Sequence, residues 1–223
     1  MKNGHVLALL GVCSMSAPIF AAIIPIDSAD RGFYSQAGVH DPANNSYFAG
    51  FNAQEFRNWF VFDLSTAPSG SWVGATLVLD GRFFSTNSTS ETYIVTSLDR
   101  PLNPLRNGNG GVSAFAAMGT GTAYGSLTRS LPNTGPATVS IPLSAAFLAD
   151  LASNPNGTFG FGGRITTLDP IGAMFGSSSS AEGGFTPRLL LDDGAATVPL
   201  PSAAGLAGLG MLLGLAAVVR PRR

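Results

Sequence analysis

The chain has 223 residues, with 12 Lys and Arg against 13 Asp and Glu, and a single cysteine. A net charge of −1 gives no basic excess for nucleic acid or an anionic membrane surface, and one cysteine excludes an internal disulfide. The 28 glycines and 15 prolines favour many short strands over long helices.

Residues 1–22 are typical of a secretory signal helix. Lys2 supplies the positive start, residues 6–12 are apolar, and Ala21 and Ala22 offer small residues for cleavage. Cys13 lies inside this segment, so the mature chain is expected to contain no thiol. Without Lys2 and the three arginines at the C-terminus, eight arginines remain against all 13 acids, a net charge of −5.

Residues 23–192 are predicted to form one all-β domain. Strands are expected at 23–28, 32–36, 57–64, 73–80, 91–98, 139–143, 158–166 and 187–192. Gly, Pro and Asn predict surface loops at 37–45 and 101–111, and residues 115–126 carry no clear pattern.

The clearest pair of strands is 57–64 and 73–80, joined by a turn at 65–71. Apolar residues alternate along both, which places the following side chains toward a core: Phe60, Phe62, Leu64, Ala75, Leu77 and Leu79. One short helix is expected at 145–152, because Ser144 is a good N-cap. Together these elements predict an antiparallel β-sandwich, jelly-roll-like, with one short helix.

Three aromatic residues are candidates for carbohydrate binding: Trp59, Trp72 and Tyr47. Trp59 falls on the strand face opposite Phe60 and Phe62, where an exposed ring would stack on a sugar. The alternative is that all three are partly buried aromatics of the sandwich.

Catalytic and metal motifs are sparse. A Ser-His-Asp triad would have to use His40, the only histidine of the predicted mature chain, so we expect no such triad. Paired carboxylates of a glycosidase need no sequence motif and stay open. A jelly roll brings its chain ends together, which makes a structural calcium site a hypothesis for Asp27, Asp30, Asp192 and Asp193; otherwise these are solvated charges. No other cofactor is expected.

The C-terminal part divides into three segments. Residues 193–201 form a linker that ends in Val198, Pro199, Leu200 and Pro201. Residues 202–219 carry no charge and predict a transmembrane helix of about 27 Å, near the lower limit for a bilayer. Arg220, Arg222 and Arg223, within 220–223, would hold its end on the cytoplasmic side.

This order of motif, helix and arginines resembles the bacterial PEP-CTERM sorting signal. The motif of that family is usually Val-Pro-Glu-Pro, and Leu200 brings this chain closer to the Val-Pro-Leu-Pro-Ala variant, with Ser202 in place of Ala. The resemblance implies processing by an exosortase-type membrane protease, with the inner membrane as a transient anchor. It also implies delivery to the surface or extracellular matrix of a Gram-negative bacterium that makes extracellular polysaccharide.

The body shows a second resemblance. The stretches RNWFVFDLS, GSWVGATLVLD, VSIPLSAAFLADLAS, TFGFGG and PRLLLD resemble a recurrent ectodomain of PEP-CTERM proteins, itself similar to DNRLRE-type jelly rolls. Some of those jelly rolls bind carbohydrate.

The sequence therefore supports three functions. The first is a non-catalytic exported surface or matrix protein, which is the interpretation we favour. The second is a carbohydrate-binding module for the polysaccharide of the host, and the third is an enzyme acting on it through two carboxylates facing each other across a cleft. Nucleic acid is not an expected partner, because the body is acidic and lacks lysine.

Overall fold

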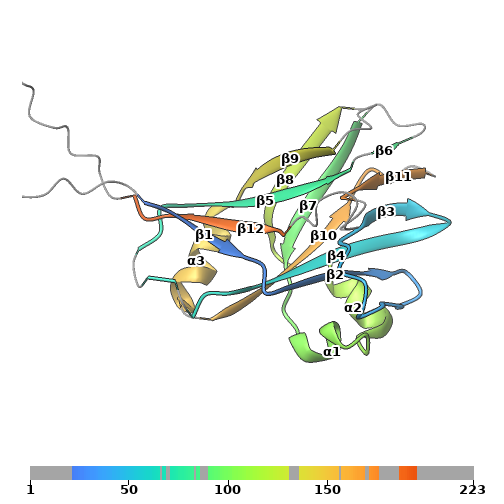
Figure 1. The fold of residues 1–223 in the computed structure, drawn as a ribbon, viewed down its shortest axis with the longest axis horizontal. Coiled ribbons are helices and arrows are strands. Elements are labelled where there is room, and N and C mark those ends of the chain that lie inside the picture. The colour runs from blue at the N-terminus through green and yellow to red at the C-terminus, as the bar shows by residue number, and fades with distance from the viewer. Residues whose placement is uncertain are drawn as a thin grey trace, which may run out of the picture. The chain divides into compact units, whose positions relative to one another are not determined.

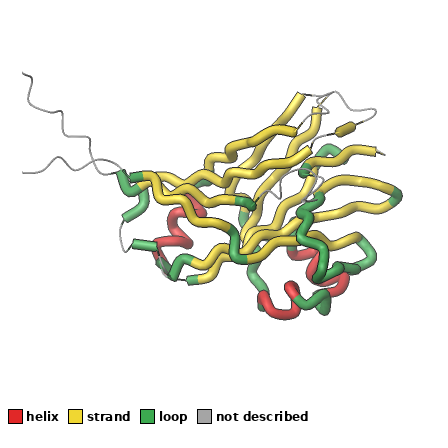
Figure 2. Tube along the Cα trace, in the orientation of Figure 1, coloured by secondary structure: helices red, strands yellow, loops and turns green. Residues whose placement is uncertain are grey.

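The computed structural model describes residues 22–65, 67–68, 71–82, 84–85, 90–130, 136–155, 157–168, 171–175 and 186–194. They belong to one compact unit, Ala22–Gly194 (Figures 1 and 2). The predicted signal helix up to residue 21, the sorting motif, the transmembrane helix and the terminal arginines lie outside the described residues. Within the described part, no helix has the length and apolar character needed to cross a bilayer.

The smaller of two antiparallel sheets joins the first and last strands of the unit. Its order is β1 (Ile23–Asp27), β12 (Arg188–Asp192), β5 (Gly74–Arg82) and β9 (Pro136–Pro142). Ile23 lies opposite Asp192, and Asp27 lies opposite Arg188. The chain therefore enters and leaves the unit at the same end of this sheet.

The larger sheet has eight strands. Its order is β6 (Phe84–Ser85), β11 (Ile171–Met174), β3 (Ala49–Asn52), β4 (Gln54–Asp63), β10 (Thr158–Ile165), β7 (Ser90–Ser97) and β8 (Ala123–Ser130). The eighth strand, β2 (Asp30–Ser35), also pairs with β4. All pairings are antiparallel, with a bulge in β7 between Val95 and Thr96.

The main hydrophobic core lies between the two sheets, as in a β-sandwich. Phe60 and Phe62 of β4 are fully buried against Leu77 and Leu79 of β5 in one cluster, which confirms the predicted alternation. A buried polar group lies in the same layer: the Asn58 side chain donates to the Tyr47 carbonyl at 2.9 Å and accepts from the Tyr93 hydroxyl at 2.7 Å. The prediction of a mostly β, antiparallel fold is correct at this level.

The strands β4 and β5 are confirmed as strands, but they do not pair. They lie in different sheets, so the chain passes from the larger sheet to the smaller one between Asp63 and Gly74. The reason is that each strand has its own antiparallel neighbours, β10 and β2 for β4, and β12 and β9 for β5.

The described residues form three short helices, whereas the sequence predicted one. The expected helix is present as α3 (Ala145–Ser153), with Phe147 and Leu151 buried in the main core. The other two, α1 (Leu102–Arg106) and α2 (Gly111–Ala117), lie in segments predicted as a loop or left without a pattern. Gly108 and Gly111, at φ +73° and +60°, allow the tight connection between them.

Helices α1 and α2 cover the outer face of the larger sheet beside β2 and β4 (Figure 1). A second core forms there, with Tyr34, Trp59 and Val61 of the strands packed against Leu105 and Phe115 of the helices. The Tyr34 hydroxyl, itself buried, donates to the Leu105 carbonyl at 2.8 Å and accepts from the Gly110 amide at 3.1 Å. These bonds fix the turn between the two helices on the sheet.

Candidate functional site

The three aromatic candidates do not form one exposed surface. Trp59 lies on the outer face of β4, as its position in the strand predicts, but only 1% of it is exposed because α1 and α2 cover that face. Tyr47 is 2% exposed and belongs to the main core. Trp72 is the one of the three that is partly exposed. Trp59 and Tyr47 therefore fit the alternative of sandwich aromatics, and Trp72 alone stays a candidate for carbohydrate binding.

The four aspartates considered for calcium are also not brought together. The chain ends do meet, since the Ala22 amide donates to Asp193 Oδ1 at 3.0 Å beside Asp192. Asp27 lies at the far end of β1, and Asp30 forms an ion pair of 2.9 Å with Arg106 of α1. Among the described residues, no three His, Cys, Asp or Glu side chains are grouped so as to hold a metal ion.

His40 is a packing residue of the second core. Its ring lies against Tyr34 and Trp59, with centroid distances of 5.0 and 5.7 Å, and its Nδ1 is 2.9 Å from the Phe33 carbonyl oxygen. Burial lowers the pKa of His40 and so favours the neutral ring. A Cβ on Gly32 would lie 2.7 Å from this ring, so the strand beneath the stack requires glycine.

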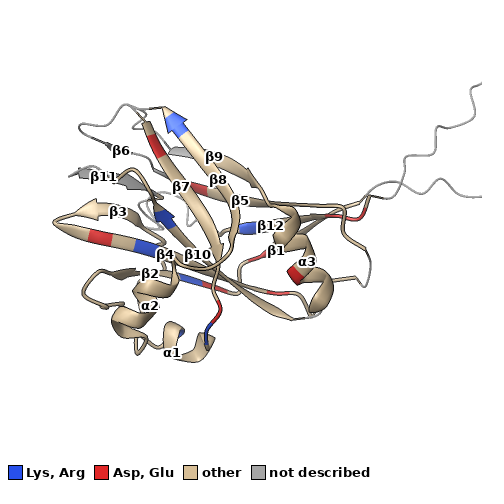
Figure 3. Ribbon diagram, turned by 180° about the vertical axis from the view of Figure 1, so that it is seen from behind, with Lys and Arg blue, Asp and Glu red and all other residues tan. Residues whose placement is uncertain are grey.

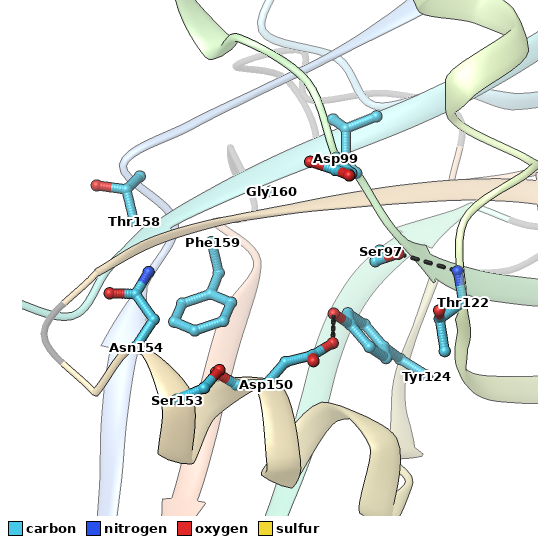
Figure 4. Close-up of a pocket in the computed structure, with 11 residues that line it drawn as sticks. Ser97, Asp99, Thr122, Tyr124, Asp150, Ser153, Asn154, Thr158, Phe159 and Gly160 are labelled. Atoms are coloured by element: carbon cyan, nitrogen blue, oxygen red, sulfur yellow. Dashed lines mark hydrogen bonds between the residues drawn. The ribbon is translucent and has the colours of Figure 1, made fainter.

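A polar cleft of about 400 Å³ lies at the end of the sandwich beside α3 (Figure 4). Four segments that are distant in sequence line it: the end of β7, the start of β8, the C-terminal part of α3 and the start of β10. The lining residues are Ser97, Leu98, Asp99, Thr122, Tyr124, Asp150, Ser153, Asn154, Thr158, Phe159 and Gly160. Figure 4 shows Asp99 on the segment after β7 and Asp150 on α3, on different walls of the cleft.

A short hydrogen bond fixes one wall of the cleft. Tyr124 is 3% exposed, and its hydroxyl donates to Asp150 Oδ2 at 2.5 Å. Burial, followed by the hydrogen bond and the charge of Asp150, raises the pKa of Tyr124. The phenol therefore remains a proton donor at physiological pH and holds the Asp150 carboxylate between β8 and α3.

The opposite wall is fixed by hydrogen bonds between the segments that carry Ser97 and Thr122. The Thr122 amide donates to Ser97 Oγ at 2.9 Å, which ties the start of β8 to the end of β7 next to Asp99. Each carboxylate has more acceptor sites than one hydrogen bond uses, so both Asp99 and Asp150 retain capacity for donors of a ligand. The cleft is thus suited to a small group rich in hydroxyl or ammonium donors.

Sequence reasoning left paired carboxylates open without assigning them to a site, and it did not single out Asp150 or Tyr124. No short motif marks these residues or Asp99, because their three segments meet only through the pairing of β7 with β8 and β10 and the packing of α3 on β8. The available signal is weak: Asp99 and Asp150 lie near the ends of elements, where polar residues are common.

The fold and the cleft define an antiparallel β-sandwich with a polar cleft at one end. Basic and acidic positions are interspersed along the strands and helices of the described part of the chain (Figure 3). No protein-family model matches the chain, and no curated protein is significantly similar to it.

Proposed function

We propose that this chain is an exported, non-catalytic protein of the cell surface or extracellular matrix, sorted through its PEP-CTERM-like tail. An exosortase-type protease would remove the tail after transient anchoring in the inner membrane of a Gram-negative bacterium. The observation that carries this proposal is the pairing of β1 with β12 at the two ends of the compact unit, Ala22–Gly194. Removal of both flanking segments would leave that pairing intact. As part of this proposal, the domain has a jelly-roll topology and is similar to DNRLRE-type domains.

The test is the intact mass of the protein recovered from its own host. We expect a mature species that starts near Ile23 and ends near Val198. A Pro199→Ala, Pro201→Ala double variant should retain the tail, whereas Ala195→Ser, in the linker before the motif, should be processed normally. A wild-type species that keeps Arg223 would overturn the sorting proposal.

A second function, carbohydrate binding, is favoured by the polar cleft. Its walls supply two carboxylates, a buried tyrosine and several hydroxyl and amide groups, which suit the multiple donors and acceptors of a sugar. We propose that extracellular polysaccharide of the host is the partner at this site.

Affinity electrophoresis through gels containing host polysaccharide tests this second function. We expect retardation of the wild type, and loss of retardation in an Asp99→Asn, Asp150→Asn double variant. Release of new reducing ends during incubation would instead indicate the enzyme, because a glycosidase also works through two carboxylates. Unretarded migration of the wild type would rule out this second function for the polysaccharide tested.

A further inference from the structure

Two hollows flank the C-terminal end of α3. The polar cleft is lined on one side by Asp150, Ser153 and Asn154. The second hollow, of about 270 Å³, is lined by Ser71, Trp72, Leu148, Leu151, Ala152 and Pro155. Asn154 and Pro155 are consecutive in the chain, yet each lines a different hollow. The last turn of α3 and the residues after it therefore form a ridge between the two.

The second hollow has the character of a stacking site. Trp72 packs partly on the main core and remains partly exposed, so its ring is held in place while it lines the hollow. Ala152 and Pro155 are exposed and add apolar surface, and Ser71 adds a hydroxyl. Sugar rings combine C–H faces with hydroxyl edges, which match an indole surrounded by such groups.

The charge of the polar cleft restricts the ligand further. Its eleven lining residues include Asp99 and Asp150 and no Lys, Arg or His. A uronate or sulfated sugar would place an anion beside two carboxylates, which is unfavourable. An amino sugar would place an ammonium group there and gain a charge-assisted hydrogen bond.

We propose that an extended amino-sugar glycan crosses the C-terminal end of α3, with one sugar in the Asp99–Asp150 cleft and another against Trp72. This inference rests on the proposed carbohydrate binding and names its ligand class and its path. A helix is about 10 Å across, so a single sugar is too short to occupy both hollows. Affinity should therefore increase with the length of the glycan.

Isothermal titration of the purified protein with β-1,4-linked glucosamine oligomers, from the monomer to the hexamer, tests the path. We expect the hexamer to bind at least about tenfold more tightly than the monomer, since each tenfold step needs only about 1.4 kcal/mol of added contact. Trp72→Ala should reduce hexamer binding about tenfold and leave monomer binding unchanged, and Trp72→Phe should retain most of the affinity. The fully N-acetylated hexamer should bind at least about tenfold more weakly, because it lacks the ammonium groups.

Asp150→Asn should weaken the binding of both the monomer and the hexamer. The amide oxygen of the asparagine can still accept from the Tyr124 hydroxyl, which preserves the wall of the cleft. Equal affinity for monomer and hexamer, with Trp72→Ala silent, would overturn the path across α3 and leave carbohydrate binding in place. If the acetylated hexamer bound as tightly as the glucosamine hexamer, the proposal of an amino sugar as the ligand would be overturned. Absence of binding to both these oligomers and host polysaccharide would contradict carbohydrate binding itself.

Discussion

At the scale of single residues, the main core depends on one glycine beside a buried polar group. Gly163 of β10 lies against Asn58 and Tyr93, and a Cβ there would collide with both the Tyr93 hydroxyl and Asn58 Oδ1. Neither side chain is free to move away, because each is buried and bonded to the other. Here a strand glycine is required by the close approach of its neighbours.

Gly163→Ala should therefore lower the free energy of unfolding by about 3 kcal/mol, the upper part of the range for overpacking a core. Urea unfolding followed by fluorescence measures the change. The matched control is Gly74→Ala in β5, where the nearest atom to a new Cβ is 3.5 Å away. We expect the control to stay within about 0.5 kcal/mol of the wild type. Equal effects of the two substitutions would contradict this account of the Asn58–Tyr93 pair.

At the scale of elements, α2 is held on the large sheet by one arginine of β4. Arg57 Nε lies 2.7 Å from Glu55 Oε1, and the guanidinium carbon lies 4.2 Å from the centre of the Phe115 ring. Arg57 also donates to the carbonyl oxygens of Phe115 and Ala116 at 3.2 and 3.4 Å. These acceptors belong to the last turn of the helix, where carbonyl groups have few helical donors, and Ala116 also accepts from the Gly119 amide at 3.1 Å.

Arg57→Lys should loosen α2 without unfolding the sheet, because lysine has neither the planar fork nor the stacking face of arginine. Hydrogen exchange resolved by peptide should be about fivefold to tenfold faster at residues 114–118, because the free energy of local opening should decrease by about 1 kcal/mol. Arg188→Lys, an exposed position of β12, is the control and should leave that peptide unchanged. Unchanged exchange in Arg57→Lys would mean that the apolar contacts of Phe115 suffice.

Strand β4 also shows which parts of the fold the sequence predicts and which it does not. The alternation in β4 places Phe60 and Phe62 on one face and Trp59 on the other, and the structure confirms both faces. Local alternation does not reveal what covers the second face, and α1 and α2 come from residues 102–117, far along the chain. The Gly-rich composition of that stretch indicated a loop, because intrinsic propensity does not include the contacts that Tyr34 supplies. The polar cleft was unpredictable for the same reason, since Asp99, Tyr124 and Asp150 meet only in the folded sheet.

At the scale of the whole molecule, all four tyrosines of the chain have pKa values raised above the ordinary value, with burial as the first cause. They are Tyr34, Tyr47, Tyr93 and Tyr124. In the unfolded chain a tyrosine loses its proton near pH 10. Below that pH both states are protonated and the full stability is present. Above it the unfolded chain releases protons that the folded chain retains, so stability decreases as pH rises.

The effect of tyrosine ionisation on stability can be observed in this chain with little contribution from other basic groups. Lys2 is its only lysine, and arginine stays protonated well above pH 11. We therefore expect the free energy of unfolding to be nearly level from pH 8 to 9.5 and to decrease above pH 10, by up to about 1.4 kcal/mol per pH unit for each tyrosine. Absorbance at 295 nm should show phenolate only as the protein unfolds. Tyr124→Phe should reduce the slope by about one proton, and a phenolate signal in the folded protein at pH 10 would contradict the burial of these hydroxyl groups.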